Sequence, residues 1–319
     1  MPKKTKSNPI DIAMIGHLCI DFLAEQDPNI VQAGGSVYYS APAAVLSGAS
    51  VRIVTKLPIQ NEVLTKELSG LTEIGVEAKM EFIDKPTILS YGDPFEEDTG
   101  WRLISAAKPF LVDRDLSDIN AKIYHISGVV RREFSYSQLD KLKARKSEQD
   151  CEIALDVQGF MREPYDTSKR IGYTRIKKIR KFLYDVDYLK VNLREAQILC
   201  NHKGELDSDI EDMELMAVQL GAYGAREVVI THRNGVVVYD SVAGETYVVP
   251  FFVSGERRGE IGKGSTCFGA YIAGKVKELN SRDAVYHAAA LTSLKLQHKG
   301  PANQRDQTEL ERKVDMMMR

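Results

Sequence analysis

The chain has 319 residues with a formal net charge of -2, and 43% of its residues are hydrophobic and 28% charged. These values are typical of an ordinary globular protein that buries a large core. A near-neutral charge argues against a nucleic-acid-binding protein, which normally carries a basic face. No apolar run approaches the ~20 residues of a membrane helix. We therefore expect neither a nucleic acid nor a membrane as a partner.

The N-terminal segment, residues 1–9, is polar and lysine-rich and is not followed by an apolar run. It predicts a disordered basic tail rather than a signal peptide. The four cysteines, at positions 19, 151, 200 and 267, include no C-x-x-C pair, so neither a zinc ribbon nor a thioredoxin motif is indicated. A reducing cytoplasm is the simplest localisation.

From residue 10 onward, short β-branched runs alternate with longer segments whose apolar residues recur at i, i+3 and i+4. This alternation is typical of an α/β protein with a mostly parallel sheet covered by helices. Strands are predicted at residues 10–15, 51–56, 123–127, 152–156, 188–192, 227–231 and 235–239. Helices are predicted at residues 36–47, 61–74, 135–145, 171–185, 194–200, 209–223, 265–279 and 282–297.

Two regions, residues 20–32 and 80–108, interrupt this alternation with short groups of hydrophobic residues and no helical periodicity. Turn signals at Asp93-Pro94 and Thr99-Gly100 separate the groups of the second region. The two regions predict either two surface hairpins or a small accessory sheet. Such a sheet would form a lid over the carboxyl edge of the main sheet, where open α/β sheets bind their ligands.

A glycine-rich turn leads into a helix of small residues at positions 260–271. Gly262 and Gly264 permit backbone conformations that let successive N–H groups point at one phosphate from a helix N-terminus. We expect Ser265 to be the N-cap of that helix, where a base would stand if a substrate hydroxyl attacked the phosphate. Serine caps a helix well but is a poor base. The ammonium of Lys263 either grips the phosphate or points to solvent.

Asp21 follows the end of the first predicted strand and precedes Gly34, Gly35 and Ser36, which open a helix of small residues. A carboxylate beside a double glycine can accept two hydroxyl hydrogen bonds from a polyol. The alternative is that Asp21 is a turn or cap residue.

Two other strand ends carry polar side chains. Asp156 and Gln158 follow one strand and can reach a ligand, whereas Asn192 and Glu195 open the helix after another. Asn192 and Glu195 suit a helix capping box. They equally suit a magnesium site in which they hold waters on the ion, so both interpretations stand.

Taken in chain order, these motifs resemble the PfkB-type, ribokinase-like family of carbohydrate kinases over nearly the whole chain. The motifs that carry the resemblance are Gly34-Gly35, Asn192-x-x-Glu195, and Gly262-x-Gly264 before the Phe268-Gly269-Ala270-Tyr271 helix. The chain looks most similar to archaeal-type members, which have a DVQG strand end and an AALTSLK-x-x-x-x-GP segment, here residues 156–159 and 289–301.

The resemblance implies one ribokinase-like domain over residues 10–315. Its doubly wound, mostly parallel sheet would carry helices on both faces and a small β-sheet lid from about residues 20–32 and 80–108. The implied reaction transfers the γ-phosphate of ATP to a hydroxyl of a sugar, nucleoside or polyol, with Mg²⁺ accompanying the nucleotide. A homodimer through the lid is common in the family.

The resemblance also implies a role for each matching position. Those facing the acceptor would be Asp21, Gly34, Gly35, Ser36, Asp156 and Gln158. Those forming the anion hole would be Gly262, Lys263 and Gly264. Those on the nucleotide side would be Asn192, Thr231, Gly235 and Gly264, and those organising magnesium through water would be Asn192 and Glu195.

The chain departs from the family at the residue that performs the chemistry. The family's last motif usually ends G-A-G-D, and its aspartate takes the proton of the attacking hydroxyl. Here the motif ends at Ser265, and Glu260 lies on the wrong side of the turn to replace the aspartate. Loss of a general base typically lowers the rate by about 10²- to 10⁴-fold. Two functions therefore remain open: a kinase that Ser265 slows or inactivates, and a non-catalytic protein that binds nucleotide and sugar.

Overall fold

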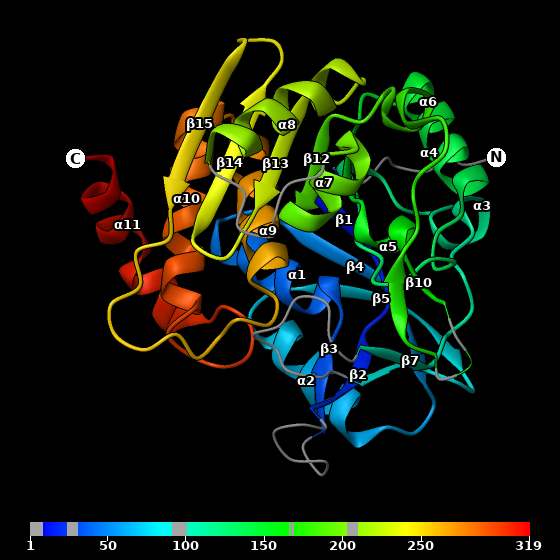
Figure 1. The fold of residues 1–319 in the computed structure, drawn as a ribbon. Helices are drawn as coiled ribbons and strands as arrows, with labels where there is room; N and C mark the ends of the chain where they lie inside the picture. The colour runs from blue at the N-terminus through cyan, green and yellow to red at the C-terminus, as the bar shows by residue number, and fades with distance from the viewer. Residues whose placement is uncertain (1–8, 24–30, 91–100, 166, 168, 203–209) are drawn as a thin grey trace, which may run out of the picture.

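The computed structural model describes residues 9–23, 31–90, 101–165, 167, 169–202 and 210–319 (Figure 1). The predicted basic tail lies outside the described residues except for its last position, and so do the two turn signals of the second lid region. Within the described ranges, no helix is both long enough and apolar enough to cross a membrane.

The main sheet has nine strands in the order β15-β14-β13-β12-β9-β8-β1-β4-β5. Their bounds are β1 Ile10–Ile15, β4 Val51–Pro58, β5 Glu77–Ile83, β8 Ala121–Ile126, β9 Glu152–Asp156, β12 Tyr188–Asn192, β13 Glu227–Thr231, β14 Gly235–Asp240 and β15 Glu245–Pro250. All neighbours are parallel except β13–β14 and β14–β15. The predicted mostly parallel α/β sheet is confirmed.

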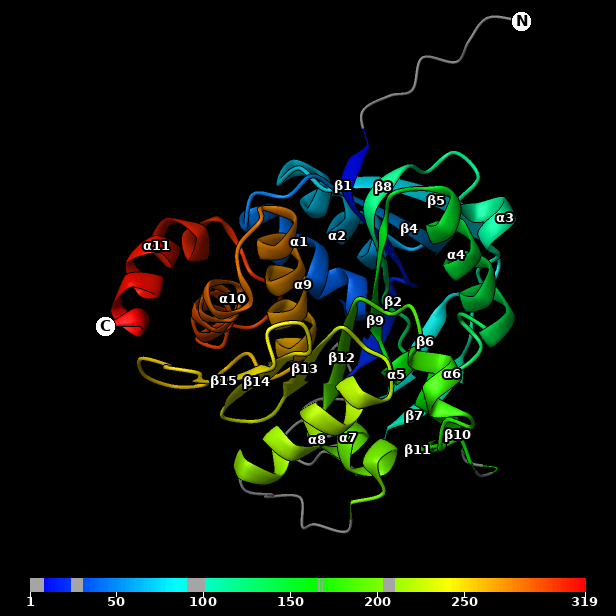
Figure 2. The same cartoon turned by 90° about the horizontal axis from the view of Figure 1, so that it is seen from above.

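Helices cover both faces of this sheet (Figure 2). Their bounds are α1 Ser36–Leu46, α2 Glu62–Glu73, α3 Val112–Asp115, α4 Tyr136–Glu148, α5 Gln158–Met161, α6 Ile179–Leu183, α7 Leu193–Cys200, α8 Ile210–Ala222, α9 Lys263–Val276, α10 Ser281–Lys295 and α11 Gln304–Met318.

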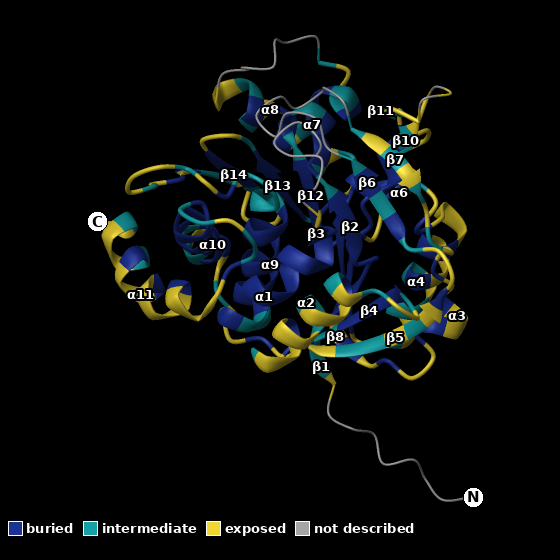
Figure 3. Cartoon of the chain, turned by 90° about the horizontal axis from the view of Figure 1, so that it is seen from below, coloured by how far each residue is buried: buried dark blue, intermediate teal, exposed yellow. Residues whose placement is uncertain are grey.

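Each face of the sheet has its own hydrophobic core, because side chains alternate along a strand. In β1, Ile12 and Met14 belong to the core that includes α1, α9 and α10, whereas Ala13 and Ile15 belong to the core that includes α4, α7 and α8. Burial on both faces explains why the central strands are almost continuously apolar. In Figure 3, α1 and α9 are buried almost throughout, while α2 and α11 present exposed faces.

The predicted small sheet is also present and has the strand order β3-β2-β6-β7. Its strands are β2 Cys19–Phe22, β3 Val31–Gly34, β6 Thr87–Ser90 and β7 Arg102–Ser105. The β2–β6 pair is parallel and the other two pairs are antiparallel. One correction concerns residues 80–83, which belong to β5 at the edge of the main sheet and not to the lid region.

The predicted helix at residues 171–185 is wrong. Its first residues form β11 Ile171–Tyr173, which pairs with β10 Arg162–Pro164. A helix begins only at α6, after Lys178, whose backbone is left-handed with φ 54°. A non-glycine residue in that conformation cannot continue a right-handed helix. The apolar periodicity of this segment therefore came from two short elements and not from one helix.

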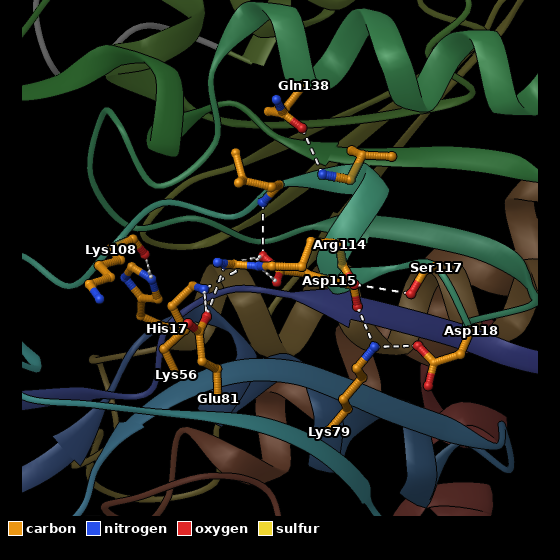
Figure 4. A network of polar contacts seen from close by, with 12 residues as sticks. His17, Lys56, Lys79, Glu81, Lys108, Arg114, Asp115, Ser117, Asp118 and Gln138 are labelled. Carbon is orange, nitrogen blue, oxygen red and sulfur yellow. Dashed lines mark hydrogen bonds and ion pairs between the residues drawn. The ribbon is translucent and has the colours of Figure 1, made fainter.

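A polar network joins the β4–β5 edge of the main sheet to α3 (Figure 4). The buried ammonium of Lys56 forms ion pairs with Glu81 and, at 3.5 Å, with Asp115. Arg114 reaches the same two carboxylates at 3.0 and 2.7 Å. Each buried charge of the network thus has a partner of opposite sign, as burial requires.

The start of α11 makes the stability of the protein depend on pH. The ring of His298 lies 2.9 Å from the carboxylate of Asp306, which also accepts the N–H of the N-cap residue Asn303. Asp306 raises the pKa of His298 above its usual value of 6.5. The contact therefore stabilises the fold fully below that value, and the contribution is lost as the pH rises through the folded-state pKa.

We predict that His298→Gln lowers the free energy of unfolding more at about pH 5.5 than at about pH 8.5, because glutamine keeps a polar group but carries no charge. Urea unfolding of parent and variant at both pH values measures the difference. An equal loss of stability at the two values would contradict the role assigned to the charged imidazole.

Candidate active site

A cavity lies where α1, α9 and the ends of several main-sheet strands meet the small sheet. In Figure 1 the small sheet lies below the main sheet, on the side where α9 begins. The residues that line the cavity are Gly35, Ser36, Tyr39, Trp101, Val129, Gln158, Arg162, Tyr173, Lys190, Asn192, Thr231 and residues 260–265. The structure thus brings together most of the site residues predicted from sequence.

The other predicted residues lie behind the cavity wall or away from it. In the part of the chain that the structure describes, the lining does not include Asp21, Gly34, Asp156, Glu195 and Gly235.

The glycine turn differs from the prediction in one respect. The N-cap of α9 is Gly262, with φ 80°, and the helix begins at Lys263. Ser265 is therefore a residue of the first helical turn rather than the N-cap. Gly262 takes the N-cap position, because glycine adopts a positive φ without strain. The N–H groups of a first helical turn have no partner within the helix and favour an anion. The expected phosphate site is thus one turn of α9 that faces the cavity.

Position 262 requires glycine for two reasons: its φ is positive, and a side chain there would clash with Tyr39. A Cβ atom at this position would lie 2.1 Å from Cγ of Tyr39 in α1. No side chain fits there unless the ring of Tyr39 moves. The turn and the first helix therefore hold each other in place.

Lys190 is a functional candidate that sequence reasoning missed. A Cβ atom at Gly264 would lie 3.3 Å from Cε of Lys190 and 3.0 Å from Oγ1 of Thr231, so both side chains adjoin the turn. The Lys190 ammonium lies 3.2 and 3.1 Å from the two carboxylate oxygens of Asp156. Lys190 was missed because it lies within an otherwise apolar strand. One signal was available: Lys190 lies two residues before Asn192, so the two side chains share a face of the strand.

Ser265 and Ser36 lie side by side although 229 positions separate them in the chain. Their hydroxyl oxygens are 3.1 Å apart. The Ser36 oxygen accepts from Nε2 of Gln158 at 2.5 Å, and its hydroxyl donates to Oδ2 of Asp156 at 3.5 Å. The predicted acceptor-side residues and the end of the glycine turn therefore form one polar cluster.

Asn192 and Glu195 form the capping box that was one of their two interpretations. Oδ1 of Asn192 accepts the N–H of Glu195 at 2.7 Å, and Oε2 of Glu195 accepts the N–H of Asn192 at 2.8 Å. Oε1 of Glu195 lies 3.3 Å from a guanidinium nitrogen of Arg162. Among the described residues, no group of three or more His, Cys, Asp or Glu could hold a metal ion directly.

Lys263 does not simply extend into solvent. Its ammonium bonds to Oε2 of Glu260 at 2.9 Å, and Oε1 of Glu260 accepts from Nε of Arg257 at 2.6 Å. Burial alone would raise the pKa of Glu260, but the two cations hold it below its usual value. Glu260 is therefore a paired carboxylate.

Asp21 and Gly34 lie against each other in the small sheet. Asp21 is fully buried in β2, and a Cβ atom at Gly34 would lie 1.8 Å from its Oδ2 atom.

Gly235 allows β14 and β15 to pair closely, because a Cβ atom there would lie 2.6 Å from the carbonyl oxygen of Val249.

Lys295 supports the glycine turn from behind and was not predicted. It is fully buried in α10, and its ammonium donates to the carbonyl oxygens of Gly259 and Ile261. The ammonium also lies 5.3 Å from the centre of the Tyr39 ring. Burial lowers the pKa of Lys295 to about 7. This side chain orders the segment that leads into the anion site.

We predict that Gly262→Ala weakens the binding of pyrophosphate by about tenfold or more, or ~1.4 kcal/mol, because the turn must shift away from Tyr39. The matched control is Gly244→Ala, since Gly244 also has a positive φ, of 70°, but has no atom within 4 Å of its Cβ position. Both variants should lose roughly 1–2 kcal/mol of stability through the left-handed backbone. Titration calorimetry measures the binding, and equal affinities in the two variants would contradict the assignment.

The amino-acid sequence is similar to those of known kinases. The family model described as pfkB family carbohydrate kinase matches residues 104–308, which is more than half of the chain. A cytidine kinase of Thermococcus kodakarensis is 26% identical over 270 residues, covering 83% of this chain and 88% of that protein.

Solved structures extend the likeness to the whole fold. A pyrophosphate-dependent kinase in the ribokinase family, complexed with a pyrophosphate analog and myo-inositol, superposes with a TM-score of 0.79 at 28% identity, covering 92% of this chain and 98% of that one. The ribokinase of Arabidopsis thaliana, complexed with ribose and ATP, has a TM-score of 0.68 at 16% identity over 96% and 99% of the two chains, which shows the shared fold. This chain belongs to the pfkB family of carbohydrate kinases.

Proposed function

We propose that this protein transfers the terminal phosphate of ATP to a hydroxyl of a small sugar, nucleoside or polyol. The observation that supports the proposal is the first turn of α9, because Lys263, Gly264 and Ser265 line a cavity that Lys190 also lines. Phosphoryl transfer depends mainly on positioning and on stabilising negative charge. A helix N-terminus and a buried cation supply that stabilisation.

The acceptor side of the cavity suits a molecule with several hydroxyl groups. Ser36 and Gln158 offer hydrogen-bonding groups. Trp101 and Tyr173 add aromatic rings to the same lining, and the Arg162 guanidinium lies 5.0 and 5.8 Å from their centres. Binding sites for small ligands commonly combine a few polar groups with aromatic walls. The relatives named above suggest cytidine, ribose and myo-inositol as the first acceptors to test.

The phosphate donor is either ATP or inorganic pyrophosphate. The similarity to a pyrophosphate-dependent kinase makes inorganic pyrophosphate the alternative to ATP. Both donors present the same terminal phosphate to the α9 turn, so that the turn alone favours neither. The two donors are therefore separate arms of the experiment below.

Magnesium fits this site as an ion that arrives with the donor phosphates. Asn192 lines the cavity and could hold one of its waters, while Glu195 is committed to the capping box and to Arg162. Mg²⁺ commonly keeps several waters and binds substrate phosphates with few protein ligands. When bound, it would neutralise charge between the donor phosphates.

The experiment supplies ATP or pyrophosphate, with and without Mg²⁺, together with each acceptor, and detects the phosphorylated product. We expect the parent chain to phosphorylate at least one acceptor. Ser265→Asp, which places a carboxylate at the family's base position, is assayed beside it. If both chains bind a donor and neither transfers phosphate to any acceptor, the kinase proposal is wrong and the non-catalytic binding protein is favoured.

We predict that Lys190→Met lowers kcat by about 10²- to 10³-fold, as expected for loss of one charge-stabilising donor. The variant also leaves Asp156 buried without its partner, which typically costs about 3–5 kcal/mol of stability. Lys56→Met is the matched control, because Lys56 is equally buried and paired but lies in the network of Figure 4. Steady-state kinetics of both folded variants should show a loss of kcat only for Lys190→Met; equal losses would contradict its role.

A further inference from the structure

A path of hydroxyl groups connects the cavity to a buried carboxylate. Ser265 lines the cavity, its oxygen lies 3.1 Å from that of Ser36, and the Ser36 oxygen lies 3.5 Å from Oδ2 of Asp156. Only 1% of Asp156 is exposed, so the carboxylate communicates with the cavity through its neighbours. Hydrogen bonds used in catalysis are often long before the substrate binds.

The donors and acceptors in this cluster give the path a direction. The Gln158 amide donates to the Ser36 oxygen, and the Ser36 hydroxyl donates to Asp156, which as a carboxylate can only accept. The Ser36 oxygen then has one lone pair left, which can accept the hydroxyl hydrogen of Ser265 at 3.1 Å. The Ser265 oxygen therefore keeps its own lone pairs for a hydroxyl of a molecule in the cavity.

The carboxylate at the end of the path can take up a proton. Burial raises the pKa of Asp156, although the adjacent Lys190 ammonium opposes the shift. Two other carboxylates near the cavity are already committed: Glu260 lies between Lys263 and Arg257, and Glu195 lies in the capping box beside Arg162.

We propose that Asp156 is the final proton acceptor of the phosphoryl transfer and that the acceptor hydroxyl reaches it through Ser265 and Ser36. This inference rests on the proposed kinase function. It assigns to Ser265 the role of a relay rather than that of a failed base. A serine at this position is then compatible with turnover, because the carboxylate is supplied by β9 instead of α9.

The acceptor oxygen forms a bond to the terminal phosphorus while the bond from that phosphorus to the leaving oxygen of the donor breaks. The acceptor proton passes to the Ser265 oxygen, the Ser265 proton to the Ser36 oxygen, and the Ser36 proton to Asp156. The electron pair of the broken bond leaves with ADP or, for a pyrophosphate donor, with phosphate. The proton returns along the same path after the products leave.

The first test compares the pH dependence of kcat in the parent and in Asp156→Asn. We expect Asp156→Asn to lower kcat by about 10²- to 10⁴-fold, the usual contribution of a general base. The kcat of the parent should fall at low pH as Asp156 becomes protonated; this fall is the acid limb of its pH profile. The variant should lack the acid limb. Asp115→Asn is the matched control, since Asp115 is a buried carboxylate paired with a lysine outside the site; its acid limb should be unchanged.

The second test is rescue. The double variant Asp156→Asn, Ser265→Asp places a carboxylate directly on α9 and should raise kcat at least about tenfold above Asp156→Asn alone. If Asp156 had only a structural role, a carboxylate on α9 would not restore kcat. If Asp156→Asn does not fold, Ser36→Ala takes its place, because it interrupts the path and leaves the Asp156–Lys190 pair intact; it too should lose the acid limb and be rescued.

The outcomes separate this inference from the kinase proposal. An active parent whose Asp156→Asn or Ser36→Ala variant keeps the parental rate and acid limb would overturn the relay alone. An inactive parent beside an active Ser265→Asp would also overturn the relay while supporting a kinase by descent. Inactivity of both, with either donor, would overturn the kinase proposal itself.

Discussion

The close approach of α1 and α9 is the contact on which the site depends. A Cβ atom at Gly269 would lie 2.3 Å from the carbonyl oxygen of Ser40, so the two helices touch through their backbones. At the start of this contact, Gly262 fits against Tyr39 and Ser265 lies beside Ser36. A bulkier residue at the crossing would separate the anion site from the acceptor side. Small residues in these helices therefore serve the geometry of the cavity as well as the packing.

Buried charge is the second organising feature. Charges that are removed from water must be paired or hydrogen-bonded. Lys190 is paired with Asp156 beside the α9 turn, and Lys295 donates to two backbone carbonyls just before it. Both lysines lie within apolar elements that also form the core. The cost of removing each ammonium from water is offset by a function: Lys295 orders the backbone before the turn, and Lys190 lines the cavity beside the anion site.

The same clustering changes the meaning of Ser265. Considered alone, a serine in place of an acidic residue indicates lost chemistry. In the structure its hydroxyl lies 3.1 Å from that of Ser36, which in turn contacts Asp156. Whether the chemistry survives then depends on three elements, β9, α1 and α9, rather than on one motif.

The α/β class, the parallel strands, the glycine turn and the family motifs could be predicted from the amino-acid sequence, because they follow from local periodicity and from residue types at short spacing. Prediction from the sequence failed at residues 171–185, where the apolar spacing of two short elements imitated one helix. It also overlooked Lys190 and Lys295, which lie inside apolar runs. The cluster of Ser36, Asp156 and Ser265 exists only in the folded protein, where α1, β9 and α9 meet. Contacts between residues more than a hundred positions apart leave no periodic signal, since the packing of helices and strands creates them.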